Sequence, residues 1–76
     1  MKELVAFIAS KLVDNPGAVE TTEREEDDTI IIDLRVAKED LGKVIGKQGR
    51  TAKAMRSVLA AAAQKRNKRS RLEIIE

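Results

Sequence analysis

The feature that most restricts the fold of this chain is the tetrapeptide Gly46-Lys47-Gln48-Gly49, which stands between two stretches of helical pattern. Glycine lacks a Cβ, so it adopts backbone dihedrals that other residues avoid. Two glycines within four residues therefore predict a tight turn from one helix to the next, with a backbone open to close approach by another molecule. The same glycines also suit a purely structural joint, because glycine is common at helix ends.

Helical patterns flank the turn on both sides. Residues 38–45 predict a short helix with Asp40 near its start, and its buried side comprises Leu41, Val44 and Ile45. Residues 50–67 predict a longer helix with cations in its last turn, where they suit the helix dipole. Its apolar face comprises Ala52, Met55, Val58, Leu59, Ala62 and Ala63.

The N-terminal segment, residues 2–14, predicts an amphipathic helix. Its apolar positions, Leu4, Val5, Phe7, Ile8 and Leu12, fall on one side of a 3.6-residue wheel. Asn15-Pro16-Gly17 ends the helix, because proline cannot continue the hydrogen-bond ladder. We expect Phe7, the only aromatic residue, to belong to the core.

The remaining segments have strand patterns. Residues 18–24 are rich in β-branched residues, and residues 29–36 alternate an apolar face (Ile30, Ile32, Leu34 and Val36) with Ile31, Asp33 and Arg35. Residues 25–28 are acidic and predict the hairpin turn between these strands, and residues 72–75 predict a short final strand. The predicted order of elements is α-β-β-α-α-β.

This order predicts an α+β fold with a three-stranded mixed sheet. The first two strands are joined by a tight turn and should be antiparallel. The second and third strands are joined through two helices and should be parallel, through a right-handed crossover. The helices should therefore pack on one face of the sheet.

Composition argues against catalysis. The chain has no cysteine and no histidine, so it lacks disulfides, thiolate metal sites and the commonest general base. Residues 42–48 resemble a P-loop only superficially, with one residue too few between the glycines and Gln48 where the magnesium-binding Ser or Thr should stand. We expect no catalytic residue, no metal, no cofactor and no small-molecule substrate.

Charge is distributed unevenly along the chain, although the net charge is only +2. Residues 43–71 contain no acidic residue and ten basic ones, namely Lys43, Lys47, Arg50, Lys53, Arg56, Lys65, Arg66, Lys68, Arg69 and Arg71. Residues 20–40 contain nine acidic residues against three basic ones. A polyanion would be steered to the basic half, which contains the glycine turn, and its binding would depend strongly on salt. The alternative is that these charges only solvate helix faces.

The apolar stretches are short. Residues 4–8 and 59–63 fall far below the roughly 20 residues that a membrane span requires. The first residues carry charges of both signs and do not have the pattern of a signal peptide. We expect a cytoplasmic protein without a membrane partner.

Together, the run Val44-Ile45-Gly46-Lys47-Gln48-Gly49 and the α-β-β-α-α-β order resemble the KH domain, with residues 1–76 as a single domain. The order is similar to that of prokaryotic, type II KH domains, in which the extra helix and strand precede the core. The length resembles that of the small stand-alone bacterial KH proteins of the KhpA type. The resemblance implies a non-enzymatic protein that clamps about four nucleotides of single-stranded RNA.

The resemblance also implies which residues contact RNA. The family pattern points to Lys43, Val44, Ile45, Gly46, Lys47, Gln48, Gly49, Arg50 and Lys53. Backbone N–H groups at the start of the following helix favour a phosphate, Lys47 adds a point charge and Arg50 a planar donor. We expect an aliphatic groove beside the loop, lined by Val44, Ile45, Leu34 and Val36. With one aromatic residue for stacking, a single groove should bind weakly.

The helix at residues 50–67 has an outer side rich in small residues, Ala54, Ser57, Ala60 and Ala61, which permit close helix-helix approach. Alanine is also simply the best helix former. The resemblance implies a homodimer through this helix and pairing with a larger KH protein of the Jag type. The expected interface comprises Ala54, Ser57, Val58 and Ala61.

Other functions stay open at this stage. One alternative is a protein-interaction module that uses the helix at residues 50–67 and retains weak nucleic-acid binding. The residues do not distinguish single-stranded RNA from single-stranded DNA. An RNA chaperone or post-transcriptional regulator, connected with cell shape and division in bacteria, is implied by the resemblance alone.

Overall fold

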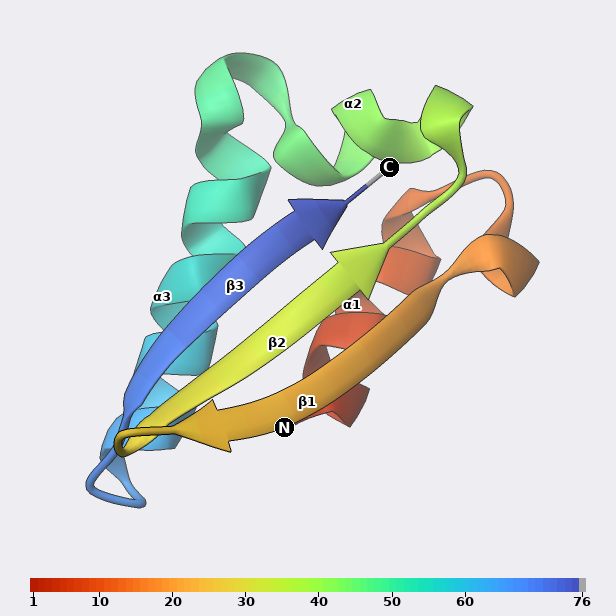
Figure 1. Ribbon diagram of the computed structural model, residues 1–76. Coiled ribbons are helices and arrows are strands. Elements are labelled where there is room, and N and C mark those ends of the chain that lie inside the picture. The colour runs from red at the N-terminus through yellow and green to blue at the C-terminus, as the bar shows by residue number, and fades with distance from the viewer. Residues whose placement is uncertain (76) are drawn as a thin grey trace.

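Three helices and three strands follow one another in a computed structural model that describes residues 1–75 (Figure 1). The elements are α1 (Lys2–Leu12), β1 (Glu20–Glu26), β2 (Thr29–Arg35), α2 (Leu41–Ile45), α3 (Arg50–Gln64) and β3 (Arg69–Ile75). Single 3₁₀ turns occupy Pro16–Ala18, Lys38–Asp40 and Lys47–Gly49. The predicted α-β-β-α-α-β order is confirmed.

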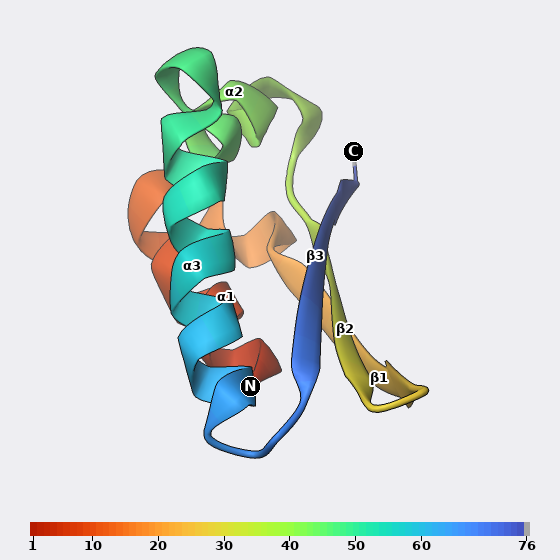
Figure 2. The ribbon, with the colours of Figure 1, turned by 90° about the vertical axis from the view of Figure 1, so that its left-hand side faces the viewer.

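The sheet has the order β1-β2-β3. β1 runs antiparallel to β2, with Glu20 opposite Arg35, and β3 runs parallel to β2, with Thr29 opposite Arg69. Figure 2 shows α1 and α3 on the same side of the sheet. The chain crosses from β2 to the parallel strand β3 through α2 and α3. The predicted mixed sheet with helices on one face is confirmed.

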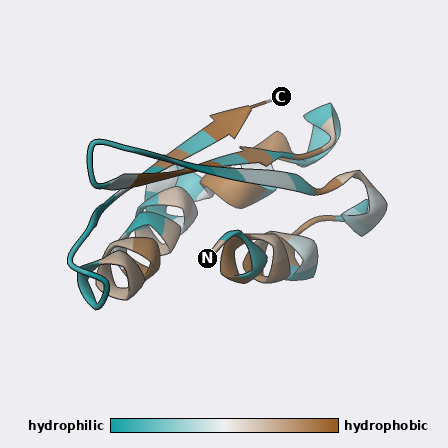
Figure 3. Ribbon diagram, turned by 60° about the horizontal axis from the view of Figure 1, so that its bottom comes forward, coloured by the Kyte–Doolittle hydropathy of each residue, from teal (hydrophilic) through white to brown (hydrophobic). Residues whose placement is uncertain are grey.

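The core lies between the sheet and the helices beneath it (Figure 3). β2 is central, and its alternating residues Ile30, Ile32 and Leu34 are at most 1% exposed. They meet buried residues of α1 (Val5 and Ala9) and of α3 (Met55, Leu59 and Ala63). The apolar face of β2, with its period of two, therefore packs against the apolar face of α3, with its helical period, as the sequence predicts.

The turns differ from expectation by a few residues. The hairpin turn is confined to Asp27 and Asp28, whose φ angles of 50° and 61° are those of a type I′ turn, so β1 extends to Glu26. α3 ends at Gln64 because Asn67 adopts a left-handed conformation and the Lys68 N–H bonds the Ala63 carbonyl at 3.0 Å. The basic residues predicted in its last turn follow the helix instead.

Five apolar residues that the helical patterns place on core-facing sides are exposed, namely Leu4, Phe7, Leu12, Ile45 and Val58, and Phe7 and Val58 are the most exposed of them. Phe7 is 61% exposed, and Lys11, one turn further along α1, places its ammonium 5.3 Å from the ring centroid. Val58 is 45% exposed on α3. Helical periodicity assigned both to the core because the apolar arc of each helix is wider than the strip that the sheet covers.

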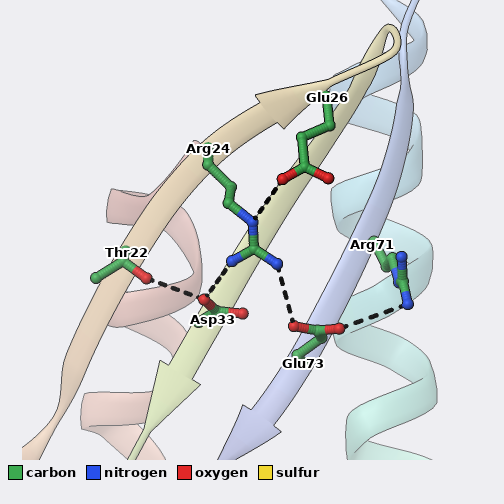
Figure 4. A network of polar contacts seen from close by, with 6 residues as sticks. All are labelled: Thr22, Arg24, Glu26, Asp33, Arg71 and Glu73. Carbon is green, nitrogen blue, oxygen red and sulfur yellow. Dashed lines mark hydrogen bonds and ion pairs between the residues drawn. The ribbon is translucent and has the colours of Figure 1, made fainter.

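The opposite face of the sheet has no helix over it, and a polar network covers it (Figure 4). Arg24 Nη1 lies 2.7 Å from Asp33 Oδ2, and Arg24 Nη2 lies 3.7 Å from Glu73 Oε1. Ile31 sits between Arg24 and Arg71 in register and is only 2% exposed. The aliphatic parts of long cationic side chains can bury such a residue without a second layer of structure.

Candidate functional site

The glycine turn joins α2 to α3 with an unusual backbone (Figure 1). Gly46 has φ 78° and ψ 172°, Gln48 has φ 58°, and Gly49 has φ 74°. A φ of this sign favours glycine, and the ψ of Gly46 belongs to a region that is essentially restricted to glycine. The sequence-based prediction of a tight turn between two helices is therefore confirmed.

The two glycines are needed for different reasons. A Cβ built on Gly46 would lie 2.9 Å from the backbone nitrogen of Thr51 and 2.7 Å from its Cβ. A Cβ on Gly49 would meet nothing within 4 Å. Gly46 therefore allows the start of α3 to pack directly against the turn, whereas Gly49 is required only by its dihedral angles.

Exposed cationic side chains surround the turn. Lys47, Arg50 and Lys53 are exposed, and none of them has an ion-pair partner among residues 1–75. Arg50 Nη2 donates to Gln48 Oε1 at 3.2 Å. The turn therefore presents unneutralised positive charge beside its backbone.

Two residues from the sequence-based set lie elsewhere. The ammonium of Lys43 donates to Asp14 and lies 3.6 Å from Asp40 Oδ1, and the Asp14 carboxylate raises the pKa of Lys43. Val44 is fully buried in the core. The prediction that Val44, with Leu34 (0% exposed) and Val36 (4%), lines an open groove is therefore wrong.

Ile45 alone among these aliphatic residues is exposed, at 37%, as a groove position requires, although the helical pattern also placed it on the buried side of its helix. The pattern missed this distinction because adjacent positions on a short helix point in directions about 100° apart. Of the aliphatic pair, Val44 anchors α2 in the core and Ile45 is exposed beside the turn.

Asp40 is a buried carboxylate at the start of α2, only 1% exposed. Burial opposes its ionisation, but the N–H groups of Asn15 and Asp14 and the ammonium of Lys43 outweigh it and lower the pKa of Asp40. A folded pKa below the unfolded value, about 3.9, means that the stabilisation is complete above that pH. It is lost as the pH falls further, through the folded pKa.

We therefore predict that Asp40→Asn melts lower than the wild type at pH 7, by on the order of 10 °C. The difference should shrink as the pH falls from 4 to 2, because the unfolded chain then binds a proton at Asp40 that the folded carboxylate resists. Thermal unfolding followed by circular dichroism at pH 7, 4, 3 and 2 measures it. A difference that stays constant over this range would contradict the assignment.

A hollow of about 290 Å³ runs between α3 and β3. Its lining comprises Arg56, Leu59 and Ala60 from α3 and Ser70, Arg71 and Leu72 from β3. The floor is apolar, and each wall supplies an arginine. No local sequence pattern predicts this groove. The parallel crossover, which places α3 along the edge strand β3, is the signal from which it could be located.

The other side of α3 is a second exposed surface. Ala54, Ser57, Val58 and Ala61 are all exposed, as expected for the predicted interface. Arg56 and Ala60 line the hollow, so these two sets occupy different flanks of the same helix. A molecule in the hollow would leave the Ala54–Ala61 flank uncovered.

Another hollow, of about 380 Å³, lies on the open sheet face and does not suit a polyanion. Its lining includes the carboxylates of Glu20 and Asp33 beside Arg35. At the far end of the sheet, Lys68 Nζ bonds Glu25 Oε2 at 2.5 Å. The basic surface is therefore smaller than the sequence count indicates, because Lys43, Lys68 and Arg71 have acidic partners.

Residues 1–75 contain no helix long and apolar enough to cross a membrane. Within the same residues, no three acidic side chains are grouped so that they could hold a metal ion.

An α-β-β-α-α-β order with a Gly-x-x-Gly turn between its last two helices defines a type II KH domain. The family described as KhpA/KhpB, KH domain, matches residues 2–74. The chain belongs to this KhpA/KhpB family of KH domains.

Similar proteins carry the name RNA-binding protein KhpA. The one from Caldanaerobacter subterraneus subsp. tengcongensis is 59% identical over 75 residues, which cover 99% of this chain and 100% of that protein. The one from Halalkalibacterium halodurans is 54% identical over 76 residues and 100% of both chains. That from Aquifex aeolicus is 50% identical over 100% of this chain and 96% of its own. No solved structure matches the chain.

Proposed function

We propose that this protein binds single-stranded RNA through the Gly46–Gly49 turn and the hollow between α3 and β3. The observation that carries the proposal is the exposed turn with positive φ angles, flanked by cations that have no acidic partner within residues 1–75. The relatives named RNA-binding protein KhpA support RNA as the ligand.

The turn anchors the sugar-phosphate backbone in this proposal. Gly46 and Gly49 allow a phosphate to approach the main chain, and the first N–H groups of α3 favour its negative charge. Lys47, Arg50 and Lys53 neutralise neighbouring phosphates, Lys47 as a mobile point charge and Arg50 as a planar donor. Gln48 is exposed and, through Arg50, held beside the same charge.

The bases rest in the hollow between α3 and β3. Leu59, Ala60 and Leu72 supply an apolar floor, and Ile45 is a separate exposed aliphatic side chain at the end of α2, before the turn. Arg56 supplies donors to base edges or phosphates, and Arg71, whose guanidinium also pairs with Glu73, lines the other wall. The only aromatic residue, Phe7, lies on α1, so aromatic stacking does not contribute in the hollow and one site of about four nucleotides binds weakly.

A dimer through the outer flank of α3 supplies the missing affinity, because a second linked site raises the effective concentration of RNA. The contact residues are Ala54, Ser57, Val58 and Ala61, which present small side chains and one exposed aliphatic side chain. The partner is a second copy or a larger Jag-type KH protein. In this proposal the protein acts in the cytoplasm as an RNA chaperone or post-transcriptional regulator connected with cell shape and division.

Ala61→Asp is predicted to raise the dimer dissociation constant by roughly a hundredfold or more, because the symmetric contact would hold two unpaired charges. Light scattering across a concentration series measures the change. Ala60→Asp is the matched control, since Ala60 is exposed on the flank that lines the hollow. A dimeric Ala61→Asp variant, or equal dissociation of both variants, would count against this interface.

A titration with short single-stranded RNA at two salt concentrations tests the binding proposal, with DNA of the same sequence in parallel. We expect affinity for RNA to fall as salt rises, because bound cations displace counterions from phosphates. A protein that dimerises but binds neither nucleic acid would be an interaction module that uses α3. The exposed flank of α3 favours that second function.

A further inference from the structure

One buried charged group plays no part in the proposed RNA contacts. Asp40 is the only charged or polar side chain that is buried among residues 1–75. A buried carboxylate is costly unless hydrogen bonds and an opposite charge satisfy it. Its presence at the start of the helix that leads to the glycine turn therefore needs a structural reason.

The partners of Asp40 come from a distant part of the chain. Its Oδ1 accepts the N–H of Asp14 at 3.2 Å, and its Oδ2 accepts the N–H of Asn15 at 3.0 Å. Asp14 and Asn15 belong to the connection that follows α1, about 25 residues earlier in the sequence. Both carboxylate oxygens thus join the end of α1 to the beginning of α2.

Lys43 closes the same cluster from the other side. Its ammonium lies 3.6 Å from Asp40 Oδ1 and also donates to Asp14. The single positive charge of Lys43 is therefore shared between two carboxylates within the fold. Although Lys43 is only three residues before Gly46, its charge is directed toward α1 and not toward the turn.

The position of the turn depends on how α2 is held. α2 comprises only five residues, too few to be stable as an isolated helix. Val44 fixes one side of it in the core, and Gly46 continues it, with its N–H bonded to the Gly42 carbonyl at 2.9 Å. The start of α2 has Asp40 as its polar anchor, so α2 is secured at both ends.

We propose that Asp40 is a positioning residue for RNA binding, which holds α2 against the end of α1 and so places the glycine turn, and that Lys43 is its counter-ion and not a phosphate contact. This inference rests on the proposed function. It gives two nearby lysines different roles. Lys47 binds RNA, and Lys43 stabilises Asp40, which holds α2 in place before the turn.

The salt dependence of RNA affinity distinguishes the role of Lys43 from that of Lys47. Each phosphate contact on a single strand contributes a slope of about −0.7 to a plot of log affinity against log salt concentration. Lys47→Met should therefore make the slope shallower by about 0.7. Lys43→Met should leave the slope unchanged, while lowering the affinity through a less well-placed turn.

Asp40→Asn tests the positioning role directly. It keeps the shape of the side chain but replaces one acceptor by a donor that faces an N–H group. We expect RNA affinity to fall roughly tenfold at a temperature where the variant is fully folded. Amide hydrogen exchange at residues 46–50 without RNA should become faster. Ile32→Val, a change in the core of β2, is the control for general loss of stability and should leave the exchange of these amides and RNA affinity unchanged.

The outcomes are distinct. Two results would overturn the inference. One is an Asp40→Asn variant with the RNA affinity and the amide exchange at residues 46–50 of the wild type. The other is a Lys43→Met variant whose slope of log affinity against log salt concentration becomes as shallow as that of Lys47→Met. If Asp40→Asn does not fold, the slope of Lys43→Met decides. An unchanged slope in Lys47→Met would instead refute the proposed phosphate contact, while the loop exchange of Asp40→Asn would still report on positioning.

Discussion

Replacing Lys47 and Gln48 together by aspartate is expected to weaken RNA binding by roughly a hundredfold, because a lost cation and two new anions face the same phosphates. Both residues are exposed, and neither side chain belongs to the core. The melting temperature should therefore stay within a few degrees of the wild type. Fluorescence anisotropy with short single-stranded RNA and thermal unfolding measure the two effects.

A matched double variant keeps this test specific. Lys11→Asp with Gln64→Asp makes the same change in net charge with the same residue types, at exposed positions on α1 and at the far end of α3. The end of α3 is roughly 20 Å from the turn, beyond the screening length at physiological salt. We expect much smaller loss of affinity in this control. Equal loss in both variants would reduce the role of the turn to general charge attraction.

Gly46→Ala is expected to destabilise the fold by ~3 kcal/mol or more, because it combines a forbidden conformation with a steric clash. The dihedrals of Gly46 lie in a region essentially restricted to glycine, and its new Cβ would press on the backbone nitrogen of Thr51 at 2.9 Å. The hydroxyl of Thr51 can rotate away, but its backbone cannot do so without moving α3. RNA affinity should fall as well, because the turn has to open.

Gly49→Ala is the matched control for this prediction. Gly49 lies in the ordinary left-handed region and has open space around its Cβ position, so alanine there should cost about 1 kcal/mol. Urea unfolding of the two variants measures both free energies. Equal costs at the two glycines would show that dihedral strain alone matters and that the contact between Gly46 and Thr51 has no energetic weight.

Much of the fold follows from local patterns. The alternation of Ile30, Ile32 and Leu34 predicts the buried face of β2 correctly, and α1 ends at Leu12, two residues before the predicted end at residue 14. The exposed residues Phe7 and Val58 were assigned to the core, because a helical wheel gives the apolar arc but not how much of it the sheet covers. The exact ends of β1 and α3 depend on the left-handed turn residues that close them.

The candidate site divides in the same way. The turn and its cations could be recognised from Gly46-Lys47-Gln48-Gly49 and the patterns on either side. The groove could not, because α3 and β3 form it together and their adjacency depends on the crossover. Arg56 and Arg71 therefore enter the proposed site only once the two elements lie side by side.

The order of the elements, the direction of the strands and the tight turn can all be derived from the chain before folding, because each depends on residue types that are close together in the sequence. Which charges are available and which aliphatic residues reach the surface depends on packing between distant segments. Lys43 and Lys47 look alike in the sequence, but Lys43 meets Asp14 and Asp40 in the fold, whereas Lys47 has no such partner within residues 1–75. Such pairing between distant segments arises only when α1 and α2 pack together, and no local pattern encodes it.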